Sequence, residues 1–264
     1  MDKYYFYAGS TPLLISMPHV GTHVPKEIAA TMTETALDLP DTDWHVDTLY
    51  DFLYETGASV ISATHSRYVI DLNRPPDGTS LYPGHDVTEL CPTTTFDNDP
   101  IYFEGQEPDS DEITTRLERY WNPYHRRLAE TLAELTGQHG YALLWDAHSI
   151  RSVVPRFFEG KLADLNLGNS DGSASDSGLA HRLLKILQDT PGYTAVLNGR
   201  FKGGYITRTY GQPAAHIHAV QLEQSQATYM EKNPPFTFRE DLAEQVRPVL
   251  RRLIETMLAW RPAN

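Results

Sequence analysis

The chain has 264 residues, of which 40% are hydrophobic and 22% charged, as expected for an ordinary globular protein with a substantial core. No apolar run approaches the length of a transmembrane helix, and the start of the chain shows no signal-peptide pattern, so we expect neither feature. The formal net charge is −13 without any run of Lys or Arg, which argues against a nucleic-acid partner. The single cysteine, Cys91, cannot form an internal disulfide, and this suits a cytoplasmic protein.

The first half of the chain alternates predicted strands with one helix. Residues 13–17 form a short apolar run that predicts a buried strand ending at His19. The segment "WHVDTLYDFLYETG", residues 44–57, has apolar side chains at helical spacing and a glycine that can end the helix. The segments "ASVISAT" and "RYVIDL" are rich in β-branched residues and predict two further strands.

Residues 74–109 are rich in Pro, Asp and Thr and show no clear period. A loop of that length in a globular domain is usually functional, so we expect a lid or a pocket wall. From 111 to 136 the apolar spacing predicts a helix that Pro123 kinks or splits.

The second half continues the alternation. "YALLW", "YTAVLN" and "HIHAVQLE" predict strands, "SGLAHRLLKILQD" predicts a helix, and "NLGNSDGSASD" and the glycine-rich "GRFKGGY" predict loops. A capping box of Thr237 and Glu240 predicts the start of a C-terminal helix, weakened in its middle by Pro248. We therefore expect one α/β domain over residues 1–264, with a largely parallel mixed central sheet and helices on both faces.

Polar residues stand at the ends of four predicted strands. Ligands bind to α/β sheets in the crevice at the carboxyl ends of the strands, so four polar strand ends predict one site built from distant segments. The residues concerned are His19, Asn73, Arg74, Asp146, His148 and Glu223.

His19 and His148 are candidate metal ligands, although a histidine at a strand end can equally satisfy a hydrogen bond in the core. Asp146 is close enough in sequence to hold the His148 ring from behind. A catalytic zinc site typically has three protein ligands, and "DTDWHVD" offers Asp41, Asp43 and Asp47 as carboxylates. Acids also favour a helix N-terminus, which is the alternative for this cluster.

Glu223 either pairs with an arginine or acts as the general base toward an activated water. Arg67, Arg74 and Arg208 are candidates for binding carboxylates, because a guanidinium matches a carboxylate in bidentate geometry. Each of them alone is equally explained by a surface ion pair. Together they predict an anionic substrate.

Taken in order, six segments resemble the N-formylglutamate amidohydrolase family over roughly residues 12 to 230. They are "ISMPHVGTHVP", "DTDWHVDTLYDF", "SRYVIDLNRPPDG", "WDAHSIRSVVP", "NGRFKGGYITRTYG" and "HAVQLEQSQATYM". The family is similar in turn to zinc carboxypeptidases and aspartoacylase-like deacylases, which implies a zinc-exopeptidase or phosphorylase-hydrolase-like fold.

The resemblance implies one divalent metal ion, zinc by preference, with His19 and His148 as ligands. Manganese, iron, nickel and cobalt also suit nitrogen and oxygen ligands. The relatives have a glutamate where this chain has Thr22, so the third ligand must come from elsewhere. We choose Asp43, with His23 and His45 as alternatives.

By the same resemblance, Asn73 and Arg74 hold a substrate carboxylate and Glu223 is the general base. The implied reaction is hydrolysis of N-formyl-L-glutamate to formate and L-glutamate, as in histidine degradation. Three alternatives stay open. The first is a deacylase of another acidic N-acyl amino acid, such as formyl-aspartate, acetyl-aspartate or succinyl-glutamate. The second is a peptidase, which is less favoured because a clamp on both carboxylates would exclude most peptides. The third is a non-catalytic binder of acidic metabolites.

Overall fold

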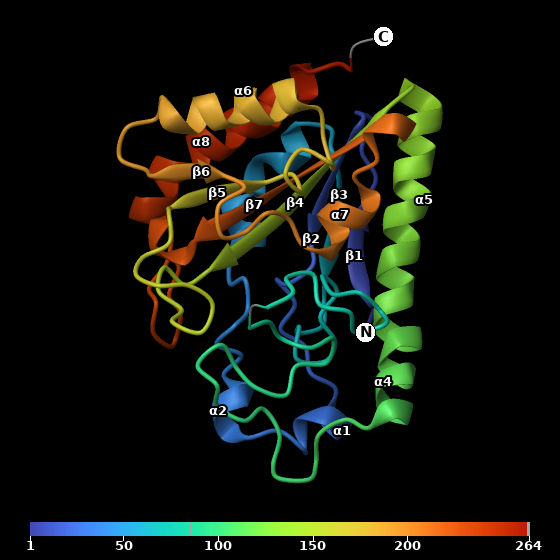
Figure 1. Cartoon of the computed structure of the whole chain (residues 1–264), viewed down its shortest axis with the longest axis vertical. Coiled ribbons are helices and arrows are strands. Elements are labelled where there is room, and N and C mark those ends of the chain that lie inside the picture. Colours follow the sequence, from blue (N-terminus) through green and yellow to red (C-terminus); the bar gives the residue numbers. More distant parts are fainter. Residues whose placement is uncertain (85, 263–264) are drawn as a thin grey trace.

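A seven-stranded mixed sheet runs through the molecule in the order β1-β3-β2-β4-β7-β5-β6 (Figure 1). This computed structural model describes residues 1–84 and 86–262. The central strands β3, β2, β4 and β7 are parallel neighbours, whereas β1 pairs antiparallel with β3, and β5 antiparallel with β7. The predicted α/β fold with a largely parallel mixed sheet is confirmed. The strands are β1 Tyr4–Tyr7, β2 Leu13–Met17, β3 Ser59–Ala63, β4 Ala142–Ile150, β5 Leu165–Gly168, β6 Ala195–Leu197 and β7 Ile217–Ser225.

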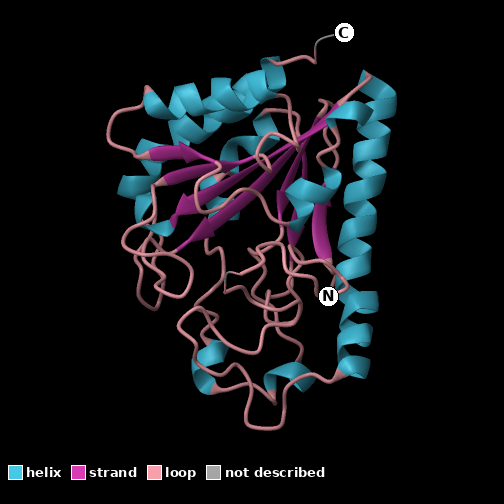
Figure 2. Ribbon diagram, in the orientation of Figure 1, coloured by secondary structure: helices cyan, strands magenta, loops and turns pink. Residues whose placement is uncertain are grey.

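Helices cover both faces of the sheet, and loops fill the region below the carboxyl ends of the central strands (Figure 2). Helices α5 and α7 pack on one face, while α6 and α8 pack on the other. The α-helices are α1 Lys26–Ala29, α2 Glu34–Leu37, α3 Val46–Leu49, α4 Ser110–Arg116, α5 Asn122–His139, α6 Ser177–Gln188, α7 Tyr205–Tyr210 and α8 Glu240–Ala259. Short 3-10 turns occupy Asp51–Glu55, Pro213–Ala215 and Gln226–Thr228. None of the helices in the described part of the chain combines the length and apolar character needed to cross a membrane.

The side chains of β4 divide between the two faces because successive residues of a strand point in opposite directions. Leu143 and Trp145 enter the core beneath α6 and α8, whereas Leu144 enters the core beneath α5. The side chains of Asp146 and His148 point toward the same face of the sheet as that of Leu144. The predicted strand "YALLW" extends to Ile150, so both polar residues lie within β4 and not beyond its end.

The prediction of a strand at "RYVIDL" is wrong. Residues 67–72 form turns in which the Val69 amide donates to the Ser66 carbonyl and the Asp71 amide to the Leu90 carbonyl. The β-branched side chains are buried, but the backbone pairs locally and with the 74–109 loop. The apolar run therefore indicates correctly that these side chains are buried, but it does not establish that the backbone forms a strand.

Other helix boundaries differ from the sequence predictions. The helix predicted over 44–57 is two short pieces, α3 and a 3-10 turn. The helix predicted over 111–136 runs from Ser110 to His139 and contains one π-helical turn, Leu117–Trp121, just before Pro123. The predicted loop "NLGNSDGSASD" begins inside strand β5, which ends at Gly168.

The capping box at the start of α8 is also wrong. Arg239 occupies the N-cap position and no side chain caps the helix. Met230 and Phe238 form an antiparallel bridge, and the Glu231 amide donates to the Thr237 carbonyl. This extended pairing keeps Thr237 out of the cap, while α8 continues without interruption through Pro248.

Candidate active site

His19, Asp43 and His148 meet near the carboxyl ends of β2 and β4. Their candidate ligand atoms all lie within 4.8 Å of one another, and all three residues are buried. His19 follows β2, His148 lies inside β4, and Asp43 is held near them because its amide donates to the His19 carbonyl. The alternative ligands lie elsewhere. The His45 ring bonds to the Phe236 carbonyl, and the His23 ring packs against His65.

Each of the two imidazoles has a carboxylate on the side away from Asp43. His19 Nε2 is 2.7 Å from Asp71 Oδ1, while its Nδ1 lies 3.7 Å from Asp43 Oδ2. His148 Nε2 is 3.2 Å from Asp146 Oδ1, and its Nδ1 is 3.2 Å from Asp43 Oδ2. Both Nδ1 atoms therefore face the Asp43 carboxylate. A carboxylate behind an imidazole is the usual way to orient a histidine toward a metal ion.

The electrostatics of this group favour an added cation. Burial alone would raise the pKa of Asp43, but hydrogen bonds and charge from His148 and His19 hold it well below the usual range. Burial opposes ionisation of Asp71 as well, and His19, Arg67 and Arg74 hold its pKa well below the usual value. Burial would lower the pKa of His148, but the carboxylates of Asp146 and Asp43 raise it well above normal. The buried carboxylates thus stay ionised and attract positive charge.

The residues present fit a divalent metal ion. His19 Nδ1 is buried and has no hydrogen-bond partner among the described residues, which is the state expected of an imidazole nitrogen awaiting a ligand. Two imidazoles and one carboxylate form a donor set that occurs in catalytic zinc sites. This group is what would hold the ion.

Glu223 stands next to His148. Strands β4 and β7 pair in parallel with His148 opposite Glu223, so the two side chains project from the same face of the sheet. The Glu223 carboxyl lines the same cavity and accepts a hydrogen bond from the Gln221 amide at 3.3 Å. Burial is the main reason that the pKa of Glu223 rises to about 8. The nearby carboxylates of Asp43 and Asp146 also raise this pKa, whereas His148 and Arg67 lower it. A carboxyl with such a pKa exchanges protons near neutral pH.

The predicted carboxylate-binding residues lie in different environments. Arg67 lines the cavity, but its guanidinium donates to Asp71 at 2.7 Å and to the Asp41 carbonyl at 3.3 Å. Asn73 also lines the cavity. Its side-chain Nδ2 lies 3.0 Å from His148 Nε2, and its side-chain Oδ1 accepts a hydrogen bond from the Ile206 amide.

Arg74 and Arg208 also differ. Arg74 lines the cavity and is bonded to Thr88. Arg208 does not line the cavity; it donates to the Gly203 and Leu81 carbonyls.

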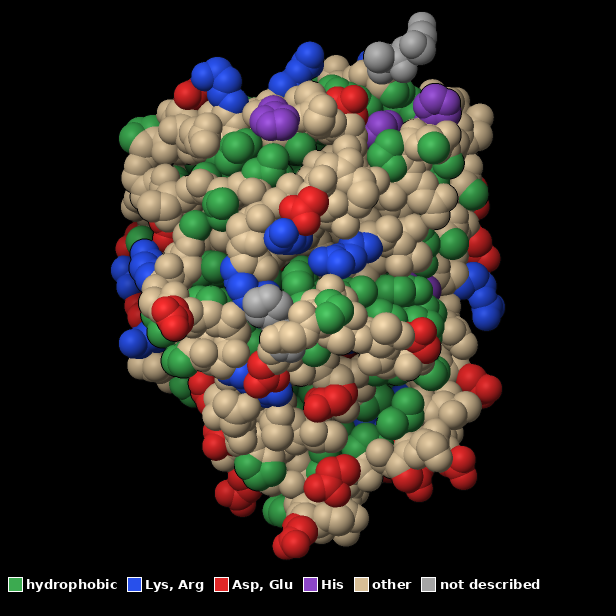
Figure 3. All heavy atoms as spheres, viewed as in Figure 1, with side chains coloured by type: hydrophobic (Ala, Val, Ile, Leu, Met, Phe, Trp, Pro, Cys, Tyr) green, Lys and Arg blue, Asp and Glu red, His purple; other side chains and the backbone are tan. Residues whose placement is uncertain are grey.

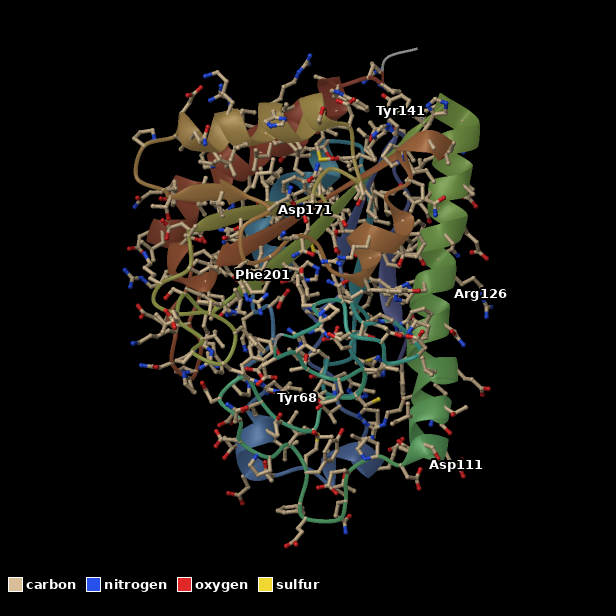
Figure 4. The ribbon with its side chains drawn as sticks, viewed as in Figure 1. Tyr68, Asp111, Arg126, Tyr141, Asp171 and Phe201 are labelled. Atoms are coloured by element: carbon tan, nitrogen blue, oxygen red, sulfur yellow. The ribbon has the colours of Figure 1, made fainter. Side chains whose placement is uncertain are left out.

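The cavity is open to the loops below the sheet and carries charge of both signs. Figure 4 shows Phe201 at the lower end of the sheet, above the loops that hold Tyr68. On the face seen in Figure 3, Lys and Arg side chains gather near the middle, whereas Asp and Glu predominate over the lower part. The 74–109 loop supplies part of the wall. The lining residues are His19, Asp43, Arg67, Asn73, Arg74, Tyr82, Asp86, Val87, Phe96, His148, Ser149, Ile150, Phe157, Arg200, Phe201, Gly204, Gln221 and Glu223.

Comparison with known proteins identifies the family. The family model described as N-formylglutamate amidohydrolase matches residues 11–230. This chain belongs to that family. The N-formylglutamate deformylase of Pseudomonas putida is 53% identical over 261 residues, covering 98% of this chain and 97% of the relative. The N-formylglutamate deformylase of Pseudomonas aeruginosa PAO1 is 54% identical over 255 residues, covering 97% and 96%.

Solved structures show the same fold. The N-formylglutamate amidohydrolase of Ralstonia eutropha JMP134 superposes with a TM-score of 0.80 at 24% identity, over 98% of this chain and 100% of that one. A gene product of Agrobacterium tumefaciens gives a TM-score of 0.73 at 18% identity, over 98% and 94% of the two chains. The fold and family predicted from the sequence are therefore confirmed.

Three residues at or beside the cavity of this amidohydrolase were missed by sequence reasoning. Gln221 and Arg200 line the cavity, and Asp71 contacts its lining residues His19 and Arg67. Asp71 lies in the segment misread as a strand, and its place two residues before Asn73 was the one signal that pointed to it. Gln221 precedes Glu223 by two positions on β7 and so shares its face. Arg200 lies in the glycine-rich turn "GRFKGGY", which the sequence predicts only as a loop. Lys202 of the same turn pairs with Asp171.

Proposed function

We propose that this amidohydrolase hydrolyses the formyl amide of N-formyl-L-glutamate, giving formate and L-glutamate. The observation that carries the proposal is the pairing of His148 with Glu223 across β4 and β7, which puts a carboxylic acid beside the candidate metal ligands in one cavity. Two N-formylglutamate deformylases that are more than 50% identical over almost the whole chain support the same reaction. The family resemblance supports a role in histidine degradation, and we propose that pathway as part of the function.

The proposal includes one divalent metal ion, zinc, held by His19, Asp43 and His148. When bound, such an ion lowers the pKa of a water molecule and polarises a carbonyl group. Asp71 and Asp146 orient the two imidazoles from behind, and this fixes which nitrogen atom faces the ion.

Glu223 acts as the proton carrier in this mechanism. Its carboxylate takes a proton from the attacking water as the new C–O bond forms at the formyl carbon. The same carboxyl then delivers that proton to the amide nitrogen as the C–N bond breaks, so that the amine leaves as a neutral group. The position of Glu223 in a buried cavity wall supports this role, because burial favours the protonated form that the second step needs.

The cationic residues of the cavity bind and orient the substrate. Formylglutamate carries two carboxylates, and a small formyl group offers little surface for binding. Anchoring the carboxylates therefore has to hold the formyl carbon in place for attack. Arg74, which lines the cavity 3.8 Å from Asp71, is a candidate for the carboxylate nearer to the reacting amide.

The test is a formate-release assay combined with metal analysis of the purified protein. We expect formate from N-formyl-L-glutamate, bound metal near one ion per chain, and loss of activity on dialysis against a chelator with recovery on adding zinc. Faster turnover of formyl-aspartate, acetyl-aspartate or succinyl-glutamate would replace the substrate assignment. Tight binding of these compounds without product would indicate a binding protein, and full activity after complete metal removal would refute the metal-dependent mechanism.

A further inference from the structure

The three arginines that line the cavity differ in how many of their nitrogen atoms are already engaged. Arg67 uses both terminal nitrogens, toward the Asp41 carbonyl and Asp71. Arg74 uses all three, with Nε and Nη2 on Thr88 and Nη1 on the Asn73 carbonyl. Arg200 uses only Nε, which donates to the Phe157 carbonyl at 2.5 Å. Within residues 1–84 and 86–262, no ion pair and no hydrogen bond is found for its two Nη atoms.

The Arg200 guanidinium is held firmly despite its free nitrogens. It lies over the Tyr82 ring at 5.4 Å and over the Phe201 ring at 5.3 Å, and both rings line the cavity. The Tyr82 hydroxyl donates to the Gly203 carbonyl and accepts from the Lys202 amide, so the ring is itself fixed. Burial lowers the pKa of Arg200, the direction expected of a cation that gives up water without gaining a carboxylate. The result is a preformed, half-buried guanidinium whose two Nη atoms have no partner among the described residues.

Arg200 also lies on a different part of the cavity wall from Arg74. Arg74 is 3.8 Å from Asp71, which contacts the candidate ligand His19. Arg200 contacts Phe157, Tyr82 and Phe201. Among the described residues, none of these three makes a hydrogen bond or a ring contact with His19, Asp43 or His148. A substrate with its formyl group at the metal ligands would therefore meet Arg74 first and Arg200 farther out.

We propose that Arg200 binds the side-chain carboxylate of the substrate and so determines the preference for an acidic N-formyl amino acid. This inference rests on the proposed function, because it assigns a residue to the second carboxylate of that substrate. The guanidinium offers two parallel N–H donors to the carboxylate, and the aromatic rings on its flanks exclude water from the pair. An uncharged substrate side chain of the same size leaves the half-buried Arg200 cation unpaired, which is a basis for rejecting that substrate.

The test compares N-formyl-L-glutamate with N-formyl-L-glutamine in the wild type, Arg200→Met and Arg200→Lys. For Arg200→Met, we expect kcat/KM to fall about 100-fold with formyl-glutamate and to change by less than about threefold with formyl-glutamine. Arg200→Lys should recover part of the loss with formyl-glutamate, because it restores the charge without the fork. Arg126→Met is the matched control: it removes the same charge from the exposed outer side of α5, away from the cavity (Figure 4), and should leave both values unchanged.

Equal losses with both substrates in Arg200→Met would overturn the inference, since a purely structural role lowers both alike. Thermal unfolding of each variant shows whether the fold is intact. Calorimetric binding of L-glutamate and L-glutamine separates this inference from the proposed function. The wild type could fail to hydrolyse formyl-glutamate and still prefer glutamate to glutamine through Arg200. That result would refute the proposed function but support Arg200 as the binding site of the side-chain carboxylate. If Arg200→Met keeps the wild-type preference for glutamate, the site assignment is wrong.

Discussion

His148 on β4 and Glu223 on β7 are direct partners in the parallel register of two neighbouring strands. Both side chains project toward the face that carries α5 and α7, beyond the apolar layer formed by Leu144 and Ala219. The candidate metal ligand and the candidate base are thus placed by the backbone of the sheet. Six consecutive register pairs on the amino-terminal side of His148 hold this relationship, starting with Ala142 and Ile217. The predictions below follow from this arrangement and from the residues around it.

Replacing Glu223 with Gln should abolish turnover without removing the metal ion. The amide has almost the same shape but cannot take a proton from water, so we expect the rate of formate release to fall about 1000-fold. Metal content, measured on the same protein, should stay at the wild-type level. Glu255→Gln, on the exposed side of α8, is the control for loss of one negative charge. Near-normal activity in Glu223→Gln would exclude this residue as the base.

Replacing Asp71 with Asn should weaken metal binding. One oxygen atom of Asp71 accepts a hydrogen bond from His19 and the other accepts from Arg67. The asparagine side chain lacks the negative charge that polarises the His19 imidazole. We expect the metal dissociation constant to rise about 10- to 100-fold, as for other residues that orient a metal-binding histidine. Competition with a chromophoric chelator measures it. Asp47→Asn, an exposed acid on α3, should have no effect, and equal affinity in both variants would contradict the role of Asp71.

Replacing Gly204 with Ala should disturb the position of Asn73. A Cβ atom at this position would overlap the Asn73 side chain, which contacts His148 Nε2 and the Ile206 amide. We expect a loss of about 1–3 kcal/mol in the free energy of unfolding together with a lower kcat/KM. Gly137→Ala is the matched control, since nothing lies within 4 Å of its added Cβ and it sits within α5. Unchanged stability and activity in Gly204→Ala would show that the contact relaxes freely.

We expect the free energy of unfolding to decrease at low pH because of His125, which is distant from the metal ligands in sequence. Its ring is stacked on Trp121 at 3.6 Å and bonds to the Leu72 carbonyl and the Tyr210 hydroxyl. Burial lowers its pKa from 6.5 to about 4, so the folded state binds this proton less readily than the unfolded state. The contribution is fully present above about pH 6.5 and is lost as the pH falls through about 4.

Urea denaturation of the wild type and His125→Gln at about pH 7 and about pH 4.5 tests this. Between these two conditions the wild type should lose about 2 kcal/mol more than the variant, because the variant has no group to protonate at this position. Parallel losses in the two proteins would mean that His125 does not carry the effect.

The parts of the fold that the sequence predicted correctly are those in which one local pattern determines the outcome. Strands β2, β4 and β7 are apolar runs buried on both faces, and such runs are typical of central parallel strands. The rule that ligands bind at the carboxyl ends of such strands then brings His19, His148 and Glu223 together before any coordinates are known.

The failures occur where distant contacts decide the structure. "RYVIDL" has the composition of a strand, but Arg67 and Asp71 bury an ion pair between them and the chain turns to make it. Whether an arginine is free to bind a substrate depends on its partners, and those of Arg74 and Arg208 come from the 74–109 loop and the turn at Gly203. The free nitrogens of Arg200 are likewise a property of the folded chain. No spacing in the sequence distinguishes it from the other arginines.

The β4–β7 register also bears on how this chain can tolerate change. The segments that join the two strands include β5, α6, β6 and the turn that carries Arg200. Insertions or deletions there alter the outer wall of the cavity while the peptide ladder keeps His148 and Glu223 at a constant spacing. The groups proposed to break the bond and the group proposed to choose the substrate are therefore separable by mutation. New specificities can arise in the loops without rebuilding the catalytic pair.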